Sequence, residues 1–204
     1  MAKDKYKFSK ILMDRVNAVT SHGGAGGPKV AIGGHSSKDV TATPSPATAR
    51  TVNLTVNGRP FSLLVEPNWP LRDVLRQKLG LISIKDFCNG YGACGSCTII
   101  MDGRPVLSCM VLAVECEGAV IETVEGIADA NHPLIEAYIM NWTAQCGYCT
   151  PGFILTAKVL LDHNVNPTVE EIKEALAGNL CRCGTYPAHI KAVLEAAREL
   201  RGAK

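Results

Sequence analysis

The chain has 204 residues and a mass of 21.8 kDa, a length that one or two ordinary domains account for. Hydrophobic residues make up 47% and charged residues 20%, which is typical of a globular fold, and the net charge of +2 gives no sign of a nucleic-acid-binding surface. No run of about 20 apolar residues predicts a transmembrane segment. The N-terminal lysines are not followed by the apolar stretch of a secretory signal, so we expect a cytoplasmic protein with reduced thiols.

The first fifty residues differ from the rest in composition and charge. They carry eight Lys/Arg and three Asp/Glu, whereas the remaining 154 residues carry thirteen and sixteen. Between residues 21 and 50, 21 of 30 residues are Gly, Ala, Ser, Thr or Pro, which bury too little apolar surface to offset the entropy lost on ordering. Residues 1–50 therefore predict a flexible N-terminal extension. Within it, the apolar spacing over residues 6–19 indicates either an amphipathic helix that docks on a partner or a frayed basic tail.

Alternating polar and apolar residues from Thr51 onward predict short β-strands. The expected strands are residues 52–56, 61–65, 98–101, 105–108 and 120–124. Asn57-Gly58 between the first two is a typical hairpin turn. A helix is expected at residues 70–79, before Gly80, and a loop rich in Gly and Cys follows at residues 88–97. Residues 51–125 thus predict an α+β domain.

The remaining residues, 126–204, have helical patterns. The expected helices are residues 133–143, 151–162, 168–177 and 187–200. Thr168 and Glu171 have the spacing of a capping box, and the short connections favour a compact four-helix bundle. Each folded unit has only about 75 to 80 residues, which is marginal for a hydrophobic core alone, so a metal centre in each would add stability.

Eight of the nine cysteines fall into two sets of four. The first set has the spacing C-x5-C-x2-C-x11-C and consists of Cys88, Cys94, Cys97 and Cys109. The second has the spacing C-x2-C-x31-C-x-C and consists of Cys146, Cys149, Cys181 and Cys183. Four thiolates complete either a tetrahedral zinc site or a 2Fe–2S cluster.

The spacing favours iron–sulfur clusters over zinc at both sets. The first set approximates the plant-type ferredoxin run, and the glycines in its loop let backbone N–H groups approach sulfur. In the second set each pair of cysteines precedes a predicted helix, whose N-terminus stabilises an anionic centre, and C-x-C is unusual for a zinc knuckle. The ninth cysteine, Cys116, has the pattern of a small buried side chain. The five histidines are dispersed and are expected at the surface or at helix ends.

Three segments carry a resemblance to a known family: CNGYGACGSCT at residues 88–98, QCGYCTPG at 145–152 and NLCRCGTY at 179–186. In this order they resemble the small iron–sulfur subunit of the xanthine-oxidase family of molybdenum hydroxylases, over about residues 51–200. The resemblance implies a plant-type ferredoxin-like (β-grasp) domain followed by the helical domain, each holding one 2Fe–2S cluster. It also implies that the first cysteine set lies nearer the flavin and the second nearer the molybdopterin, with Gln145 and Cys183 as candidate molybdopterin contacts.

The same resemblance implies partners and a reaction. A large subunit would hold molybdopterin and a medium subunit FAD, in a dimer of heterotrimers, and this chain would relay single electrons from molybdopterin through its clusters toward FAD. No nucleophile–base pair or carboxylate pair belongs to a motif, so no catalytic residue is expected on this chain. Two alternatives stay open: a free-standing ferredoxin-like electron carrier and a zinc-stabilised interaction module.

Three features depart from the family pattern. Five residues instead of four separate Cys88 from Cys94, and Phe87 stands where a glycine is common. The extension at residues 1–50 is absent from many family members. We expect the glycine-rich loop to absorb the extra residue, with a change in the local geometry of the first centre.

Overall fold

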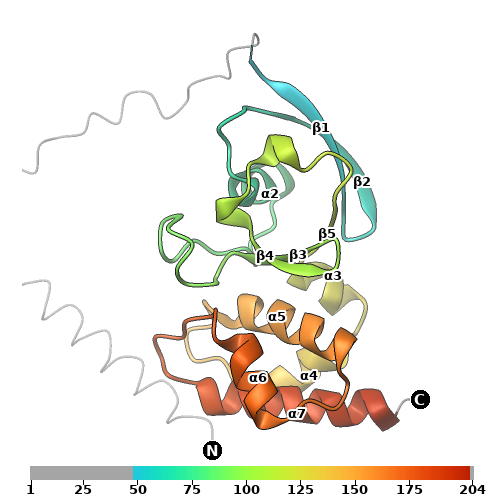
Figure 1. Cartoon of the computed structure of the whole chain (residues 1–204), viewed down its shortest axis with the longest axis vertical. Helices are drawn as coiled ribbons and strands as arrows, with labels where there is room; N and C mark the ends of the chain where they lie inside the picture. The colour runs from blue at the N-terminus through green and yellow to red at the C-terminus, as the bar shows by residue number, and fades with distance from the viewer. Residues whose placement is uncertain (1–47, 203–204) are drawn as a thin grey trace, which may run out of the picture. The chain divides into compact units, whose positions relative to one another are not determined.

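The computed structural model describes residues 48–202, which lie within one compact unit (Figure 1). The predicted helix at residues 6–19 lies outside the described residues, as does most of the predicted extension. The strands are β1 (Arg50–Val56), β2 (Arg59–Val65), β3 (Thr98–Met101), β4 (Arg104–Leu107) and β5 (Val120–Glu122). The α-helices are α2 (Leu71–Leu79), α3 (Val124–Asp129), α4 (Pro133–Met140), α5 (Thr150–His163), α6 (Val169–Leu176) and α7 (Tyr186–Gly202). Two short 3-10 helices are η1 (Ser108–Met110) and η2 (Ala113–Glu115).

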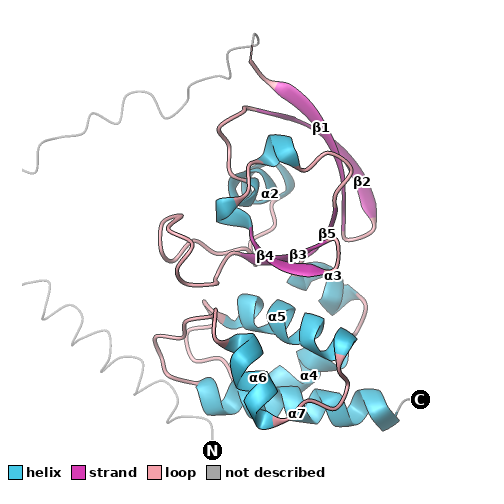
Figure 2. Ribbon diagram, in the orientation of Figure 1, coloured by secondary structure: helices cyan, strands magenta, loops and turns pink. Residues whose placement is uncertain are grey.

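The strands form a mixed five-stranded sheet in the order β2-β1-β5-β3-β4 (Figure 2). Two antiparallel hairpins supply four of the strands, and Asn57 and Asp102 begin their turns at positive φ, each followed by a glycine. The short β5 pairs parallel with β1 and antiparallel with β3. The last strand therefore joins the two hairpins, and the cysteine loop before β3 is anchored on this sheet.

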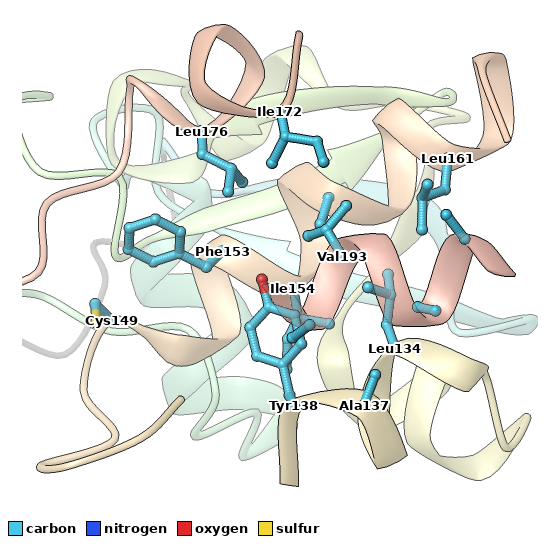
Figure 3. Close-up of a cluster of buried hydrophobic side chains, with 14 of the residues drawn as sticks. Leu134, Ala137, Tyr138, Cys149, Phe153, Ile154, Leu161, Ile172, Leu176 and Val193 are labelled. Atoms are coloured by element: carbon cyan, nitrogen blue, oxygen red, sulfur yellow. The ribbon is translucent and has the colours of Figure 1, made fainter. Parts of the chain in front are cut away.

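Hydrophobic side chains are buried in two large clusters and one small one. The first cluster combines the inner residues of the sheet with one face of α2. The second lies among α4, α5, α6 and α7, and Figure 3 shows its side chains, Phe153 and Leu134 among them, converging from these helices. In the small third cluster, Ile100 of β3 and Leu155 of α5 are buried together. The sheet thus packs directly on α5, the helix that follows two of the predicted metal ligands.

Among the element boundaries that differ from the sequence-based expectation, two have a clear physical cause. The strand expected to reach residue 124 ends at Glu122, because Val124 begins α3, a six-residue helix too short for its periodicity to be recognised. The helix expected at 133–143 ends at Met140, since Trp142 adopts φ = 52°, a left-handed conformation that terminates a helix. The capping box predicted at the start of α6 is confirmed.

A polar network ties the first hairpin turn to α3. The N–H of Thr123 donates to Asn57 Oδ1, and Asn57 Nδ2 donates to Thr123 Oγ1, both at 2.9 Å. The carboxylate of Glu125 accepts hydrogen bonds of 2.6 Å from the hydroxyls of Thr123 and Ser83, and one of 3.0 Å from the Ser83 N–H. Burial alone would raise the pKa of Glu125, but these hydrogen bonds outweigh it and hold the pKa below its ordinary value.

Replacing Glu125 by glutamine is expected to lower the free energy of unfolding by about 2 kcal/mol at pH 7, because three donors lose a charged acceptor. Since the folded-state pKa of Glu125 is depressed, its stabilisation is present above the ordinary value of 4.5 and is lost as the pH falls through the folded-state pKa. Urea unfolding should therefore show the difference between the two proteins shrinking from pH 7 to pH 3. The exposed Glu174→Gln is the control, and a difference that does not change with pH would contradict this account.

Candidate metal centres

The four cysteines of the first set lie together beside α2. Three come from the loop before β3, and Cys109 comes from η1. The thiol of Cys88 contacts that of Cys94, and the thiol of Cys97 contacts that of Cys109. Cys94 and Cys97 are buried and the other two are partly exposed. The sulfur atoms of the four cysteines predicted from the spacing therefore form one compact group.

Backbone N–H groups of the loop converge on Cys88. Burial alone would raise the pKa of this thiol, but hydrogen bonds from backbone N–H groups, that of Ala93 first among them, outweigh it and lower the pKa to about 7. The pKa of Cys109 is raised to about 12 by its burial and by the neighbouring Cys97. Cys88 thus loses its proton easily, whereas Cys109 resists becoming a second thiolate in the same group. This pattern fits a cationic centre that all four thiolates share.

A buried cation lies beside the first set. Arg72 of α2 places Nε 2.8 Å from Asp73 Oδ1 and Nη1 2.7 Å from Asp86 Oδ1. Hydrogen bonding to Asp73 outweighs the effect of burial and raises the pKa of Arg72, so the guanidinium stays charged. Its charge acts on Cys109, and Asp86 precedes Cys88 by two residues. Arg72 thus both positions the start of the loop and favours thiolates in it.

The second set combines a buried pair of cysteines with an exposed pair. Cys146 and Cys149 precede α5, whereas Cys181 and Cys183 precede α7. The exposed Cys146 and Cys183 have their Sγ atoms 3.5 Å apart. The buried Cys149 and Cys181 are in thiol contact, and Figure 3 shows Cys149 at the margin of the helical core. A centre held by this set is therefore anchored in the core and open to the surface on one side.

The thiol of Cys181 contacts a threonine hydroxyl. Burial alone would raise the pKa of Cys181, but the hydroxyl and N–H of Thr185 outweigh it and lower the pKa to about 7. Thr185 Oγ1 lies 3.2 Å from Cys181 Sγ and 3.1 Å from His189 Nε2. Burial lowers the pKa of His189 to about 4, so its ring is neutral near pH 7. The pKa of Cys149 is raised to about 12, first by burial and then by Cys181.

One backbone hydrogen bond connects the two cysteine sets. The N–H of Leu180, directly before Cys181, donates to the carbonyl oxygen of Cys94 at 2.9 Å. Beside it, Asn179 Nδ2 donates to the carbonyl oxygen of Gly95 at 3.0 Å, and the Asn179 side chain is buried. Side chain and backbone thus hold the loop of the first set against the loop of the second.

A second contact between the sets involves the unusual Phe87. The hydroxyl of Tyr148, which lies between two ligands of the second set, donates to Asp86 O at 2.9 Å and accepts from Asp86 N at 3.2 Å. The ring of Phe87 lies 5.9 Å from that of Tyr148, centroid to centroid. Phe87, the predicted departure from the family pattern, therefore packs against the neighbouring cysteine loop.

Both parts of the chain match known iron–sulfur domains. The model of a 2Fe-2S iron-sulfur cluster binding domain matches residues 54–125, and that of a 2Fe-2S binding domain matches residues 123–194. The small FeS subunit of nicotinate dehydrogenase from Eubacterium barkeri is 49% identical over 67% of this chain and 87% of its own length. The small subunit of nicotine 6-hydroxylase from Paenarthrobacter nicotinovorans is 46% identical over 76% of this chain and 93% of its own length.

A solved structure agrees with these matches. Quinoline 2-oxidoreductase from Pseudomonas putida 86 has a chain that is 40% identical, with a TM-score of 0.72, over 76% of this chain and 98% of that one. The fold and the two sites thus define a protein with two 2Fe–2S-binding domains. The chain belongs to the small iron–sulfur subunits of the xanthine-oxidase family of molybdenum hydroxylases. Its function is that of the electron-transfer iron–sulfur subunit of an oxidoreductase. Among residues 48–202, no helix is long and apolar enough to cross a membrane.

The structure adds one finding about the histidines and confirms the expectation about Cys116. His189 lies at a helix end, as expected, but it is also fully buried, which the sequence did not predict. His189 lies in the first turn of α7, four residues after Thr185. Its burial could be predicted only by knowing which face of α7 packs inward. Cys116 is buried as predicted, and burial raises the pKa of its thiol to about 11. Gln145, a predicted molybdopterin contact, is exposed beside Cys146.

Replacing Gly95 by alanine is expected to destabilise the fold by about 3 kcal/mol or more, and to reduce the iron bound per chain. A Cβ at this position would lie 2.5 Å from both Asn179 Nδ2 and the carbonyl oxygen of Gly178. Gly103→Ala is the matched control, because Gly103 has nearly the same positive φ (76° against 73°) but open space around it. That control should cost only about 1 kcal/mol in urea unfolding. Equal losses in both variants would show that backbone strain, not the close contact, is what matters.

Proposed function

We propose that this chain relays single electrons from a molybdopterin centre on a large partner, through two 2Fe–2S clusters, toward FAD on a medium partner. The observation that carries the proposal is the hydrogen bond from Leu180 to Cys94, which joins two four-thiol groups within one compact unit. A 2Fe–2S cluster accepts and releases one electron at a time. The residues of this chain hold the clusters at a fixed separation and surround the sulfur atoms with hydrogen-bond donors.

The proposed cluster ligands are the two sets predicted from spacing. The cluster on the flavin side is held by Cys88, Cys94, Cys97 and Cys109. The cluster on the molybdopterin side is held by Cys146, Cys149, Cys181 and Cys183. The exposure of Cys183 and Gln145 supports a role for both as molybdopterin contacts, because a partner's cofactor reaches only exposed groups.

The finer architecture belongs to the same proposal. Residues 51–125 form a plant-type ferredoxin-like (β-grasp) domain and residues 126–204 a four-helix-bundle domain, with residues 1–50 as an extension. The chain works in the cytoplasm, in a complex that is a dimer of heterotrimers. The mixed sheet and helices α4 to α7 support this layout.

The two alternatives make different demands on the molecule. A zinc-stabilised module needs no contact between its two thiol groups, whereas here backbone and side-chain hydrogen bonds join the two loops that carry them.

A free-standing carrier needs no large exposed apolar surface. Ile139, Met140 and Trp142 are 69%, 63% and 86% exposed, and we call these three residues the α4 patch. A patch of this kind favours a partnered protein.

Serine substitutions of Cys94 and Cys149 should each remove one cluster and leave the other. We expect the full-length protein, purified anaerobically with its partners, to contain four iron and four acid-labile sulfide per chain, as two 2Fe–2S clusters imply. Each variant should retain half of both, and each should lose a different electron paramagnetic resonance signal after reduction with dithionite. Zinc in place of iron in the wild-type protein would overturn the proposal.

The α4 patch is the proposed contact with the large partner, because it lies just before the exposed Gln145 and Cys146. Trp142→Ala removes a large, 86% exposed ring held in a left-handed turn. Since aromatic anchors contribute about 2 kcal/mol or more at interfaces, the affinity for the large subunit should fall about 30-fold.

Leu64→Ala on β2 is the control for the α4 patch, because Leu64 is also well exposed, at 54%. Size-exclusion chromatography of the complex at falling concentration measures the effect, with iron content showing that the chain stays intact. Undiminished affinity in Trp142→Ala would move the interface elsewhere, and equal losses in both variants would show that the effect is not specific to the patch.

A further inference from the structure

Two side chains, Thr185 and His189, form a hydrogen-bonded pair directly beside a predicted cluster ligand. Thr185 Oγ1 lies 3.2 Å from Cys181 Sγ and 3.1 Å from His189 Nε2. Thr185 immediately precedes α7 and His189 lies in its first turn, so the two face the same side at a spacing of four residues. Hydrogen bonds to ligand sulfur are among the means by which a protein sets the reduction potential of an iron–sulfur cluster.

The surroundings of His189 hold its ring in one orientation. The residue is fully buried, and its ring stacks on Phe153 with a centroid distance of 4.0 Å and an interplanar angle of 2°. The ring of Tyr138 lies 5.5 Å away on a tilted plane. Among the described residues, His189 Nδ1 has no hydrogen-bond partner. The ring of His189 therefore acts on its polar surroundings through the contact of Nε2 with Thr185 Oγ1.

The charge on the sulfur decides which way the hydrogen bonds point. A threonine hydroxyl has one proton, which it donates either to Cys181 Sγ or to His189 Nε2. A cluster thiolate carries negative charge and makes the stronger acceptor, because charge-assisted hydrogen bonds are about twice as strong as neutral ones. The hydroxyl proton then points at sulfur, and the free lone pair of Thr185 Oγ1 accepts from the Nε2–H of His189. The two hydrogen bonds polarise each other in this direction.

We propose that His189 and Thr185 form a relay of hydrogen bonds that ends on Cys181 and raises the reduction potential of the cluster on the molybdopterin side. This inference rests on the proposed function. Reduction adds negative charge to the cluster and its sulfur ligands, so a donor aimed at Cys181 Sγ stabilises the reduced state more than the oxidised state. Thr185 and His189 are positioning residues, since only Thr185 touches a ligand and His189 acts through it.

The test compares Thr185→Val with Thr185→Ser in the full-length chain within its complex. Valine keeps the shape of threonine and removes the hydroxyl, so the midpoint potential of the cluster on the molybdopterin side should become more negative. Serine keeps the hydroxyl and should restore the wild-type potential. Redox titration followed by electron paramagnetic resonance measures both clusters, and the flavin-side cluster in the same sample should not move. Iron and sulfide per chain should equal wild type in both variants.

His189→Phe tests the direction of the relay, because phenylalanine retains a ring that can stack on Phe153 and removes both nitrogens. We expect a negative shift smaller than that of Thr185→Val, and a double variant that matches Thr185→Val alone. A positive shift would overturn the proposal, since it would show that His189 had been taking the hydroxyl proton away from sulfur. No shift in His189→Phe would also overturn it. If Thr185→Val fails to assemble the cluster, the potential of His189→Phe by itself tests the proposal.

The failure of this inference differs visibly from a failure of the proposed function. A wild-type complex with no iron on this chain would overturn the proposed function. Unchanged potentials in a Thr185→Val variant that holds all its iron would overturn only the relay.

Discussion

The close approach of two backbone segments, residues 94–96 and 178–181, is the constraint on which both centres depend. A side chain at Gly95 or Gly152 would collide with it, because a Cβ on Gly152 would lie 2.4 Å from the carbonyl oxygen of Gly95. Asn179 fills the remaining polar positions, with one bond to Gly95 and one to Thr156. The two cysteine sets lie against different hydrophobic cores, so these contacts set the distance that an electron must cross between them.

The two thiol groups share an electrostatic arrangement that suits a cationic centre held by several thiolates. In each, one thiol has its pKa lowered to about 7 by hydrogen-bond donors that outweigh burial, and another has its pKa raised to about 12 by burial and a neighbouring sulfur. The donors differ, however. The first set combines loop N–H groups with the nearby charge of the buried Arg72, whereas the second combines N–H groups with the Thr185 hydroxyl. Different donors give the two centres different means of setting their potentials.

Much of this site could be predicted from local patterns. The grouping of eight cysteines, the hairpin turn at Asn57 and the capping box at Thr168 each depend on residues a few positions apart or on ligand spacing. The contacts that complete the site are long-range. Asn179 and Gly95 are 84 residues apart, and no periodicity links them. The burial of His189 depends on which face of α7 meets α4 and α5, and α3 owes its start to contacts with a distant turn.

The second set consists of a buried pair and an exposed pair of cysteines, and the two pairs have different surroundings. The buried Cys149 and Cys181 contact the helical core, and there packing holds the Thr185 hydroxyl beside Cys181. The exposed Cys146 and Cys183 lie outside this core, with their Sγ atoms 3.5 Å apart. If Thr185 and His189 set the potential as proposed, a substitution behind Cys181 changes that potential while the exposed pair of thiols stays as it is.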